Sequence, residues 1–462
     1  MIKPVKNKNI FSGWRKLSLQ KAAKYTIVVT GSFIFLVILI FIFFHNPIIN
    51  IFIKDRITES YNKANLEYTL KLGDMNYNIW KNSLSSDSVS LKSADSSIIY
   101  KAASITIGGI GWFKVLLQMD LRMNNLTSSV INAQDIVINF PKSKNELHLN
   151  TLYVSIYDST ITADSIKYYS LIDDEQYFAE SLFRQTRFYL NIPKIKAVGM
   201  DCISLLEGSV YKLKNISIYN MSADILVNMD KPYDISLAKP LMPNELFANF
   251  KKTVNIDSLK IINAQLKYSE RYAVKAVPGV ITFDKVNVLG SGINNYSERT
   301  DTAAIYAEGI FMNSAEMKLF MKIPLTSKEF SFQYNGSLSS MDATGLNKFI
   351  VPAEFHHINS GFINSASFNI NVNSGNAGGN LRVAYKDLSI SILNKKTGSQ
   401  DGIFDRITSL IGEIFVIRGT NLPDKNGKME IGEVKYTRNR DDYFLQFVWF
   451  ALRSGVADVV GF

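Results

Sequence analysis

Few residues in this chain are of the types that carry acid–base or metal chemistry. There are four histidines, His45, His148, His356 and His357. His356 and His357 are adjacent, whereas two metal ligands on one helix face need a spacing of three or four residues. Glu354 alternates with His356, so a two-ligand metal pair on a strand stays open beside the simpler reading of a solvated loop pair. We predict no metal site.

Catalytic motifs and phosphate-binding loops are also absent from the sequence. The run GGIG at 108–111 lacks the third glycine of a dinucleotide loop and the Lys-Ser/Thr of a P-loop, so we interpret it as a strand-to-helix turn. No G-x-S-x-G or H-E-x-x-H motif occurs. A carboxylate pair for glycoside hydrolysis stays open, because such pairs come from distant strands, but the acidic run at 173–175 is more simply a negatively charged helix start. We predict that the chain is not an enzyme, with no catalytic residue and no cofactor.

The elements that must position any site begin with an apolar stretch near the N-terminus. Residues 25–44 read YTIVVTGSFIFLVILIFIFF, without one charged side chain. An α-helix rises about 1.5 Å per residue, so this stretch covers about 30 Å, the hydrocarbon thickness of a bilayer. We predict a transmembrane helix, rather than a buried core helix, with Tyr25 and Phe44 as its membrane-anchoring ends.

The charges that flank this stretch indicate its orientation. Residues 1–24 contain seven Lys or Arg residues and no acidic residue, which accounts for most of the formal net charge of +10. The positive-inside rule keeps such a tail in the cytoplasm. Neither a small-residue cleavage site nor a lipobox cysteine follows, so we favour an uncleaved signal anchor over a cleaved signal peptide. We predict a single-pass inner-membrane protein with a periplasmic body, and no nucleic-acid partner.

The exported part, 45–462, has the composition of a folded protein. The whole chain is 47% hydrophobic and 20% charged, which argues against disorder. Cys202 is the only cysteine, so the chain has no intramolecular disulfide. We expect Cys202 to be a small buried residue, with pairing between chains as the alternative. Packing and backbone pairing must therefore hold the body together.

Period-two alternation of apolar and polar residues recurs through the exported part. Turn signals, such as Asn335-Gly336 and the run SGNAGGN at 374–380, separate the alternating segments. One apolar and one polar face per strand predict a one-sided antiparallel sheet, whose polar face includes Asn369, Asn371, Ser389 and Ser391. The side chains that we expect to line its apolar groove are Ile136, Ile138, Leu152, Val154, Ile156, Phe368, Ile370, Val372, Leu388, Ile390 and Ile392.

Helical patterns are few and short. The predicted helices cover 47–65, 112–118, 173–186, 403–417 and 443–460. The predicted organisation is a basic cytoplasmic tail (1–24), a signal anchor (25–44), a juxtamembrane amphipathic helix with a first strand (45–72), a β-groove body (73–400) and C-terminal helices with a hairpin (401–462). The predicted fold is thus mainly β: one N-terminal transmembrane helix, then an elongated, curved antiparallel β-sheet groove with a few short helices and a helical C-terminal cap.

This order of parts resembles the AsmA-like family of envelope proteins. The segment 103–140 is similar to that family's strand, short helix and paired strands. The segment VNIDSLKIINAQLKYSE, 254–270, resembles its Asp-Ser-Leu element with a Tyr-ended strand. The best match is 337–393, which is similar to the conserved C-terminal region, and the closing FVWFALRSGVADVV resembles the aromatic tail helix. The resemblance covers nearly the whole chain.

The resemblance implies a repeating β-groove, shared with bridge-like lipid-transfer proteins. Strands stack about 4.8 Å apart, so some twenty strands would give a body on the order of 100 Å long. The implied function is to bind, shield or transfer phospholipid between inner and outer membranes. The implied partners are phospholipid acyl chains, the inner membrane at the N-terminal helix, and an outer-membrane protein or membrane at the C-terminal end. Two alternatives remain: an anchored scaffold for outer-membrane biogenesis that moves no lipid, and an envelope polysaccharide hydrolase.

Overall fold

The computed structural model describes residues 30, 32–37, 46–47, 49–111, 127–201, 204, 210–234, 236, 239–295, 302–392 and 417–461. Tyr25, Phe44, Cys202, the predicted helix at 112–118 and nearly all of the predicted helix at 403–417 lie outside these residues. Within the described ranges, no helix has the length and the apolar character that crossing a membrane would need.

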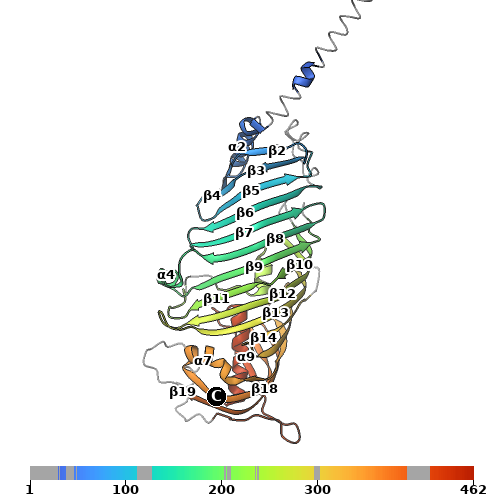
Figure 1. Cartoon of the computed structure of the whole chain (residues 1–462). Helices are drawn as coiled ribbons and strands as arrows, with labels where there is room; N and C mark the ends of the chain where they lie inside the picture. The colour runs from blue at the N-terminus through green and yellow to red at the C-terminus, as the bar shows by residue number, and fades with distance from the viewer. Residues whose placement is uncertain are drawn as a thin grey trace, which may run out of the picture.

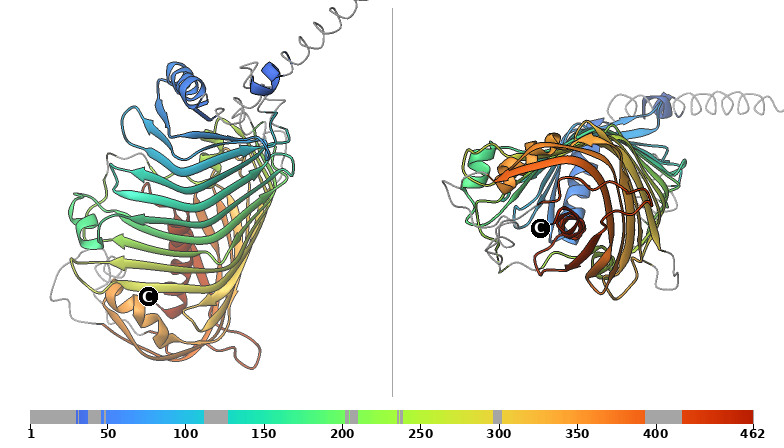
Figure 2. Two further views of the ribbon diagram at one scale, coloured as in Figure 1. Left: turned by 45° about the horizontal axis from the view of Figure 1, so that its top comes forward. Right: turned by 90° about the horizontal axis from the view of Figure 1, so that it is seen from below.

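The described chain is mainly β and forms one twenty-stranded sheet, which curls along its length (Figures 1 and 2). The prediction of a mainly β fold is therefore confirmed. The strands are β1 (Tyr68–Leu72), β2 (Met75–Asn78), β3 (Ser83–Ser86), β4 (Val89–Ser93), β5 (Ile99–Gly108), β6 (Val130–Phe140), β7 (Asn145–Ser155), β8 (Thr160–Ser170), β9 (Thr186–Val198), β10 (Val210–Tyr219), β11 (Ser222–Asn228), β12 (Thr253–Arg271), β13 (Gly279–Asn294), β14 (Ala303–Phe311), β15 (Ala315–Ile323), β16 (Phe332–Leu338), β17 (Met341–Asp342), β18 (His356–Asn373), β19 (Asn376–Ile392) and β20 (Gly432–Thr437).

Several short strands lie end to end and share one position in the sheet. β3 and β4 both pair with β5, while β2 and β1 pair with β3 and β4 respectively. In the same way, β10 and β11 both pair with β9, and β16 and β17 both pair with β18. The sheet therefore has about sixteen strand positions, or roughly 75 Å of length at the usual spacing, which is shorter than the sequence suggested.

The sheet is not wholly antiparallel, and on this point the prediction is wrong. β12 pairs in parallel with both β10 and β11. Parallel neighbours need a crossover connection of a dozen or more residues. Residues 229–252, which include helix α6 (Pro243–Asn249), supply that connection and return the chain to the level where β10 begins.

A line of left-handed residues bends the strands at one level of the sheet. Asp135, Ser165, Asn220, Asn263 and Lys285 have φ between 47° and 55°, inside or between strands that otherwise continue straight. The register places Asn150 opposite Asp135 and Ser165, and Pro193 opposite Ser165 and Asn220. The left-handed residues of β6, β8 and the β10–β11 junction therefore lie at one level, with Asn150 of β7 and Pro193 of β9 between them. Short polar side chains tolerate this conformation best.

The left-handed residues decide which side chains of a strand share a face of the sheet. Ile131 and Ala133 precede Asp135 at odd positions, whereas Ile136 and Ile138 follow it at even positions. Alternation with a period of two restarts after the left-handed residue, so both pairs of apolar side chains stay on one face. A straight strand would have turned half of them toward water.

The helices match the sequence prediction in part. The predicted helix at 47–65 is present as the π-helix η1 (Ile49–Lys54) and α2 (Asp55–Ala64), and the predicted helix at 443–460 is α9 (Phe444–Val460). The helix predicted for 173–186 is only α4 (Asp174–Ala179). The helices that the sequence did not reveal are α6, the 3-10 helix η3 (Ala343–Leu346) and α7 (Asn347–Glu354).

Two turn predictions are wrong for steric and pairing reasons. Asn335 and Gly336 lie inside β16, where a Cβ at Gly336 would come within 2.5 Å of the Phe368 ring. The glycine therefore makes room for an aromatic side chain and does not form a turn. The predicted C-terminal hairpin is also not formed, since β20 pairs with β19, far away in sequence. The turn at Ser374 and Gly375 is correct, with positive φ at both residues.

Candidate functional site

The candidate site is the apolar face of the sheet, which we call the trough face. It is defined by a row of cross-strand partners that share a face, because directly opposite side chains on paired strands are neighbours. The row takes one residue from each strand position between β5 and β19. In order, its members are Ile105, Ala133, Leu152, Ala163, Ile195, Ile218, Ile261, Val288, Ala307, Leu319, Gly336, Phe368 and Leu381.

The opposite face is polar from β6 to β12. Its adjacent row runs through Asn132, Tyr153, Thr162, Lys196, Ser217 and Lys260. Asn132, Lys196 and Lys260 are exposed, and the Tyr153 side chain is 39% exposed. Over β6–β12 the sheet therefore has one polar and one apolar face. On β13–β15 the opposite row continues through Leu289, Tyr306 and Phe320, of which Leu289 is 48% and Tyr306 39% exposed.

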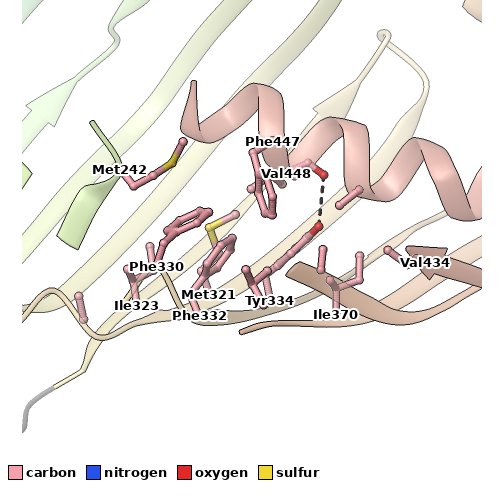
Figure 3. Close-up of a cluster of buried hydrophobic side chains, with 14 of the residues drawn as sticks. Met242, Met321, Ile323, Phe330, Phe332, Tyr334, Ile370, Val434, Phe447 and Val448 are labelled. Carbon is pink, nitrogen blue, oxygen red and sulfur yellow. Dashed lines mark hydrogen bonds between the residues drawn. The ribbon is translucent and has the colours of Figure 1, made fainter. Parts of the chain in front are cut away.

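Helix α9 shows that the trough face is the concave one. α9 lies inside the curl of the sheet and packs against β19 and β20 (Figure 2). The side chains beneath it belong to the trough face: Tyr334, Ile370 and Val434 are fully buried against Phe447 and Val448 (Figure 3). The Tyr334 hydroxyl donates a hydrogen bond to the Val448 carbonyl over 3.2 Å (Figure 3).

The C-terminal third of the trough face is therefore a closed core. The rings of Phe330 and Phe332 lie 5.1 Å and 6.2 Å from that of Phe447, centroid to centroid. Arg438 ties the start of the α9 region to α6, donating to both oxygens of Glu245 over 2.9 Å and 3.2 Å. This hydrogen bonding lowers the pKa of Glu245 to about 2. We call this region the covered end.

The N-terminal end of the sheet is covered as well, by a smaller cluster. Ile49 of η1 packs with Met75, Tyr77, Leu84 and Ile110, all of them at most 7% exposed. Side chains of η1 and the preceding helical turn also pair with the backbone of β2, the edge strand. Such pairing protects a sheet edge that would otherwise expose free backbone groups.

Between the two ends, the described structure leaves the trough face open. Leu152, Ile195, Ile218, Ile261 and Val288 are neither buried nor fully exposed. Helix α4, which follows β8, lies at the edge of the sheet and not over it (Figure 1), and α9 packs against β19 and β20. We call this region, from β6 to the half of β13 around Val288, the open part. The other half of β13 is covered, since Ile281 packs in one cluster with Leu346 of η3 and α7 packs against this strand.

The structure divides the predicted groove residues between these regions. Ile136, Ile138, Leu152 and Val154 are half-buried in the open part. Ile156 is buried with Met200 where β7 ends. Phe368, Ile370 and Val372 belong to the core under α9, so for these three the prediction of an open groove lining is wrong.

The remaining predicted residues lie at the far end of β19. Leu388 packs with Tyr385, Val459 and Val460, and Ile390 is half-buried opposite Ile358. Ile392 lies opposite His356 at the end of β19, and its side chain is not described. Of the residues expected to face water, Asn369, Asn371 and Ser389 are exposed, while Ser391 is half-buried and bonds Asn359.

The open part contains apolar residues that the sequence reading missed, including Ala163, Ile195, Ile218, Ile261 and Val288. A recurring pattern in the sequence could have revealed these apolar residues. Two short apolar runs of opposite parity, separated by one Asp, Asn or Ser, recur in β6, β7, β8 and β12. That spacing marks a bend within a strand and not the end of a strand.

The ionisable side chains that could take part in catalysis or metal binding instead make contacts that stabilise the fold. Asp173 caps α4 by accepting from the Gln176 amide over 2.8 Å, and Asp174 pairs with the buried Arg187 over 2.9 Å. Glu175 pairs with Arg271, which is also buried. His356 is buried beside the Glu354 carbonyl, while His357 is exposed. In the part of the chain that the structure describes, no group of three or more His, Cys, Asp or Glu residues is placed to bind a metal.

Comparison with known proteins adds no identification. The sequence matches no protein-family model, and a search of curated proteins gives no significant match.

Proposed function

We propose that this chain is a membrane-anchored, AsmA-like envelope protein whose open part holds phospholipid acyl chains and shields them between membranes. The N-terminal apolar segment would hold the protein in the inner membrane. The covered end would close the trough at its far side. No step of this function needs a catalytic group.

One observation carries the proposal: the row of apolar partners continues through the open part without a polar interruption and without a described element over it. A large apolar surface left in water is unfavourable, by about 25 cal/mol per Å². Soluble proteins rarely leave such a patch bare unless something binds there. An acyl chain gains about 0.8 kcal/mol for each buried CH₂ group, so chains lying along the row are suitable occupants.

The polar opposite face supports the same proposal. A transport surface for lipid in an aqueous compartment must be apolar on one side only, so that the body itself stays soluble. Lys196 and Lys260 on the convex side meet that need. Between its two covered ends, the trough has no described helix enclosing the open part, so polar headgroups could remain in water while the chains lie on the sheet.

The test compares two substitutions at adjacent positions of β7. Leu152 lies in the trough row, and Tyr153 points to the opposite face. We expect full-length wild-type protein to co-purify with phospholipid, measured by lipid mass spectrometry. Leu152→Asp should remain folded and carry several-fold less lipid, because a carboxylate in the row opposes acyl chains. Tyr153→Asp should carry as much lipid as the wild type.

Other outcomes would count against the proposal. A wild-type protein without bound lipid would favour the scaffold function. Equal lipid loss in both variants would show that the row is not the binding face.

A further inference from the structure

The β2–β3 turn carries the most exposed large apolar side chain of the described residues. Trp80 is 96% exposed, and its neighbour Ile79 is 36% exposed. A bare tryptophan is unusual on a protein that is bathed by water on all sides, because Trp contributes a large apolar surface. The surroundings of this turn therefore need an explanation.

Two side-chain hydrogen bonds hold the turn that carries Trp80 in place. The Tyr77 hydroxyl bonds the Asn82 side chain over 3.0 Å across the turn. Asn82 in turn donates to the Ile110 carbonyl over 2.7 Å. Tyr77 and Leu84, which flank the turn, are both buried.

Hydrogen bonds fix the direction in which the turn points. The Met75 amide donates to Asn50 Oδ1 over 2.6 Å, and the Tyr77 amide donates to Asn46 Oδ1 over 2.9 Å. Two strand residues rise about 6.6 Å, and four helical residues rise about 6 Å, so the strand and the helical segment run side by side in opposite directions. From Met75 to Tyr77, strand β2 therefore runs toward the residues that precede Asn46 in the chain.

This direction leads to the apolar segment. Tyr77 is level with Asn46, which comes two residues after Phe44, the last residue of the apolar run at 25–44. The turn lies beyond Tyr77 on that side. Figure 1 agrees, since β2 lies at the end of the sheet on the side of residues 32–37.

We infer that the β2–β3 turn is a second membrane contact, in which Trp80 and Ile79 enter the interfacial layer of the bilayer that holds the N-terminal segment. Tryptophan favours that layer because its ring is apolar and its indole N–H is polar. Lys81 follows directly and can extend its ammonium group to lipid phosphates. The contact would fix the angle between the trough and the membrane, which a single helix cannot do. This inference rests on the proposed membrane anchoring.

The experiment uses the full chain in vesicles of phosphatidylethanolamine and phosphatidylglycerol with brominated acyl chains, which quench nearby tryptophan. The chain has four tryptophans, Trp14, Trp80, Trp112 and Trp449. One variant keeps only Trp80 and a second keeps only Trp449, which is 42% exposed on α9 at the other end of the body. The other tryptophans are changed to Phe.

We expect bromine close to the headgroup to quench Trp80 several-fold more than Trp449, and more than deeply placed bromine does. Equal quenching of the two, or a Trp80 emission spectrum typical of water, would overturn the inference and favour a protein partner for the turn. Carbonate extraction of the same vesicles separates the two hypotheses. A chain that is extracted refutes the anchor itself, whereas a chain that resists extraction with an unquenched Trp80 refutes only the second contact.

Discussion

The open part and the covered end belong to one sheet and share one apolar row, yet they differ in what lies over the side chains of that row. At the covered end, α9 buries Leu381 to 3% exposure. In the open part, Leu152 has no described helix over it. The same sequence pattern thus builds a protein core at one place and a bare apolar wall at another.

The two regions also obtain their curvature differently. The line of left-handed residues crosses the open part, whereas β14, β15 and β16 contain no residue with positive φ. The open part is bent by its own backbone at one level, while at the covered end positive φ occurs in β18 and β19, at Gly361 and Asp387. A wall that curves without a helix inside it can leave its concave side to a ligand.

The largest expected effect is on stability at the covered end. Leu381→Asp should lower the free energy of unfolding by several kcal/mol, because a carboxylate would be buried without a partner. The matched change Leu152→Asp, in the same row, should cost much less, because that site is reached by water when no lipid covers it. Urea denaturation followed by circular dichroism measures both. Asn380→Asp, at the exposed neighbour of Leu381, is the control for added charge.

Equal destabilisation by Leu381→Asp and Leu152→Asp would contradict the distinction between the two regions. It would mean that the open part is also a closed protein core, and the lipid proposal would then lose its site.

The ion pair between Arg438 and Glu245 should contribute next most. Arg438→Met removes two hydrogen bonds to Glu245 and one of 2.9 Å to the Pro240 carbonyl. We expect a loss of about 1–3 kcal/mol, since the partly buried carboxylate then keeps only the Met242 amide, over 2.8 Å, and the more exposed Lys239 as partners. Lys239→Met is the matched control, because Lys239 is 3.4 Å from the same carboxylate but half exposed. It should cost less than about 0.5 kcal/mol.

The same ion pair predicts a pH dependence. Arg438 lowers the pKa of Glu245 from the ordinary 4.5 to about 2 in the folded protein. The stabilisation is therefore complete above about pH 4.5 and is lost as the pH falls toward 2, because protonated Glu245 no longer pairs with Arg438. The stability difference between wild type and Arg438→Met should shrink over that interval. A constant difference would show that Arg438 acts through its packing on Phe330 and its hydrogen bond to the Pro240 carbonyl, and not through Glu245.

The sequence predicts the sheet well, because period-two alternation is a local property of each strand. Ile136, Ile138, Leu152 and Val154 are in the trough row or beside it, as expected. α9 is also recognisable from its own residues, but its position is not. Nothing local in Phe368, Ile370 or Val372 reveals that a helix some eighty residues later covers them.

The errors in the prediction have the same long-range origin. Gly336 is read as a turn residue because the ring of Phe368, which needs its space, is distant in sequence. β12 pairs in parallel because α6 and its flanking loops bring the chain back, which alternation alone cannot show. The extent of the open part likewise depends on which segments return to cover the sheet.

The smallest expected effect tests how the open part is bent. Asn263 has φ of 55°, and its amide group donates to Asn220 Oδ1 over 2.8 Å while its backbone amide donates to Asn287 Oδ1 over 3.1 Å. Asn263→Gly keeps the left-handed backbone and should cost only a few tenths of a kcal/mol. Asn263→Val should cost about 1–2 kcal/mol, because a β-branched residue resists positive φ. If the bend shapes the trough, Asn263→Val should also reduce bound lipid although residue 263 is exposed and outside the trough row. Normal lipid content in a destabilised Asn263→Val protein would show that other residues determine the curvature of the open part. The left-handed residues would then only connect the two halves of each strand.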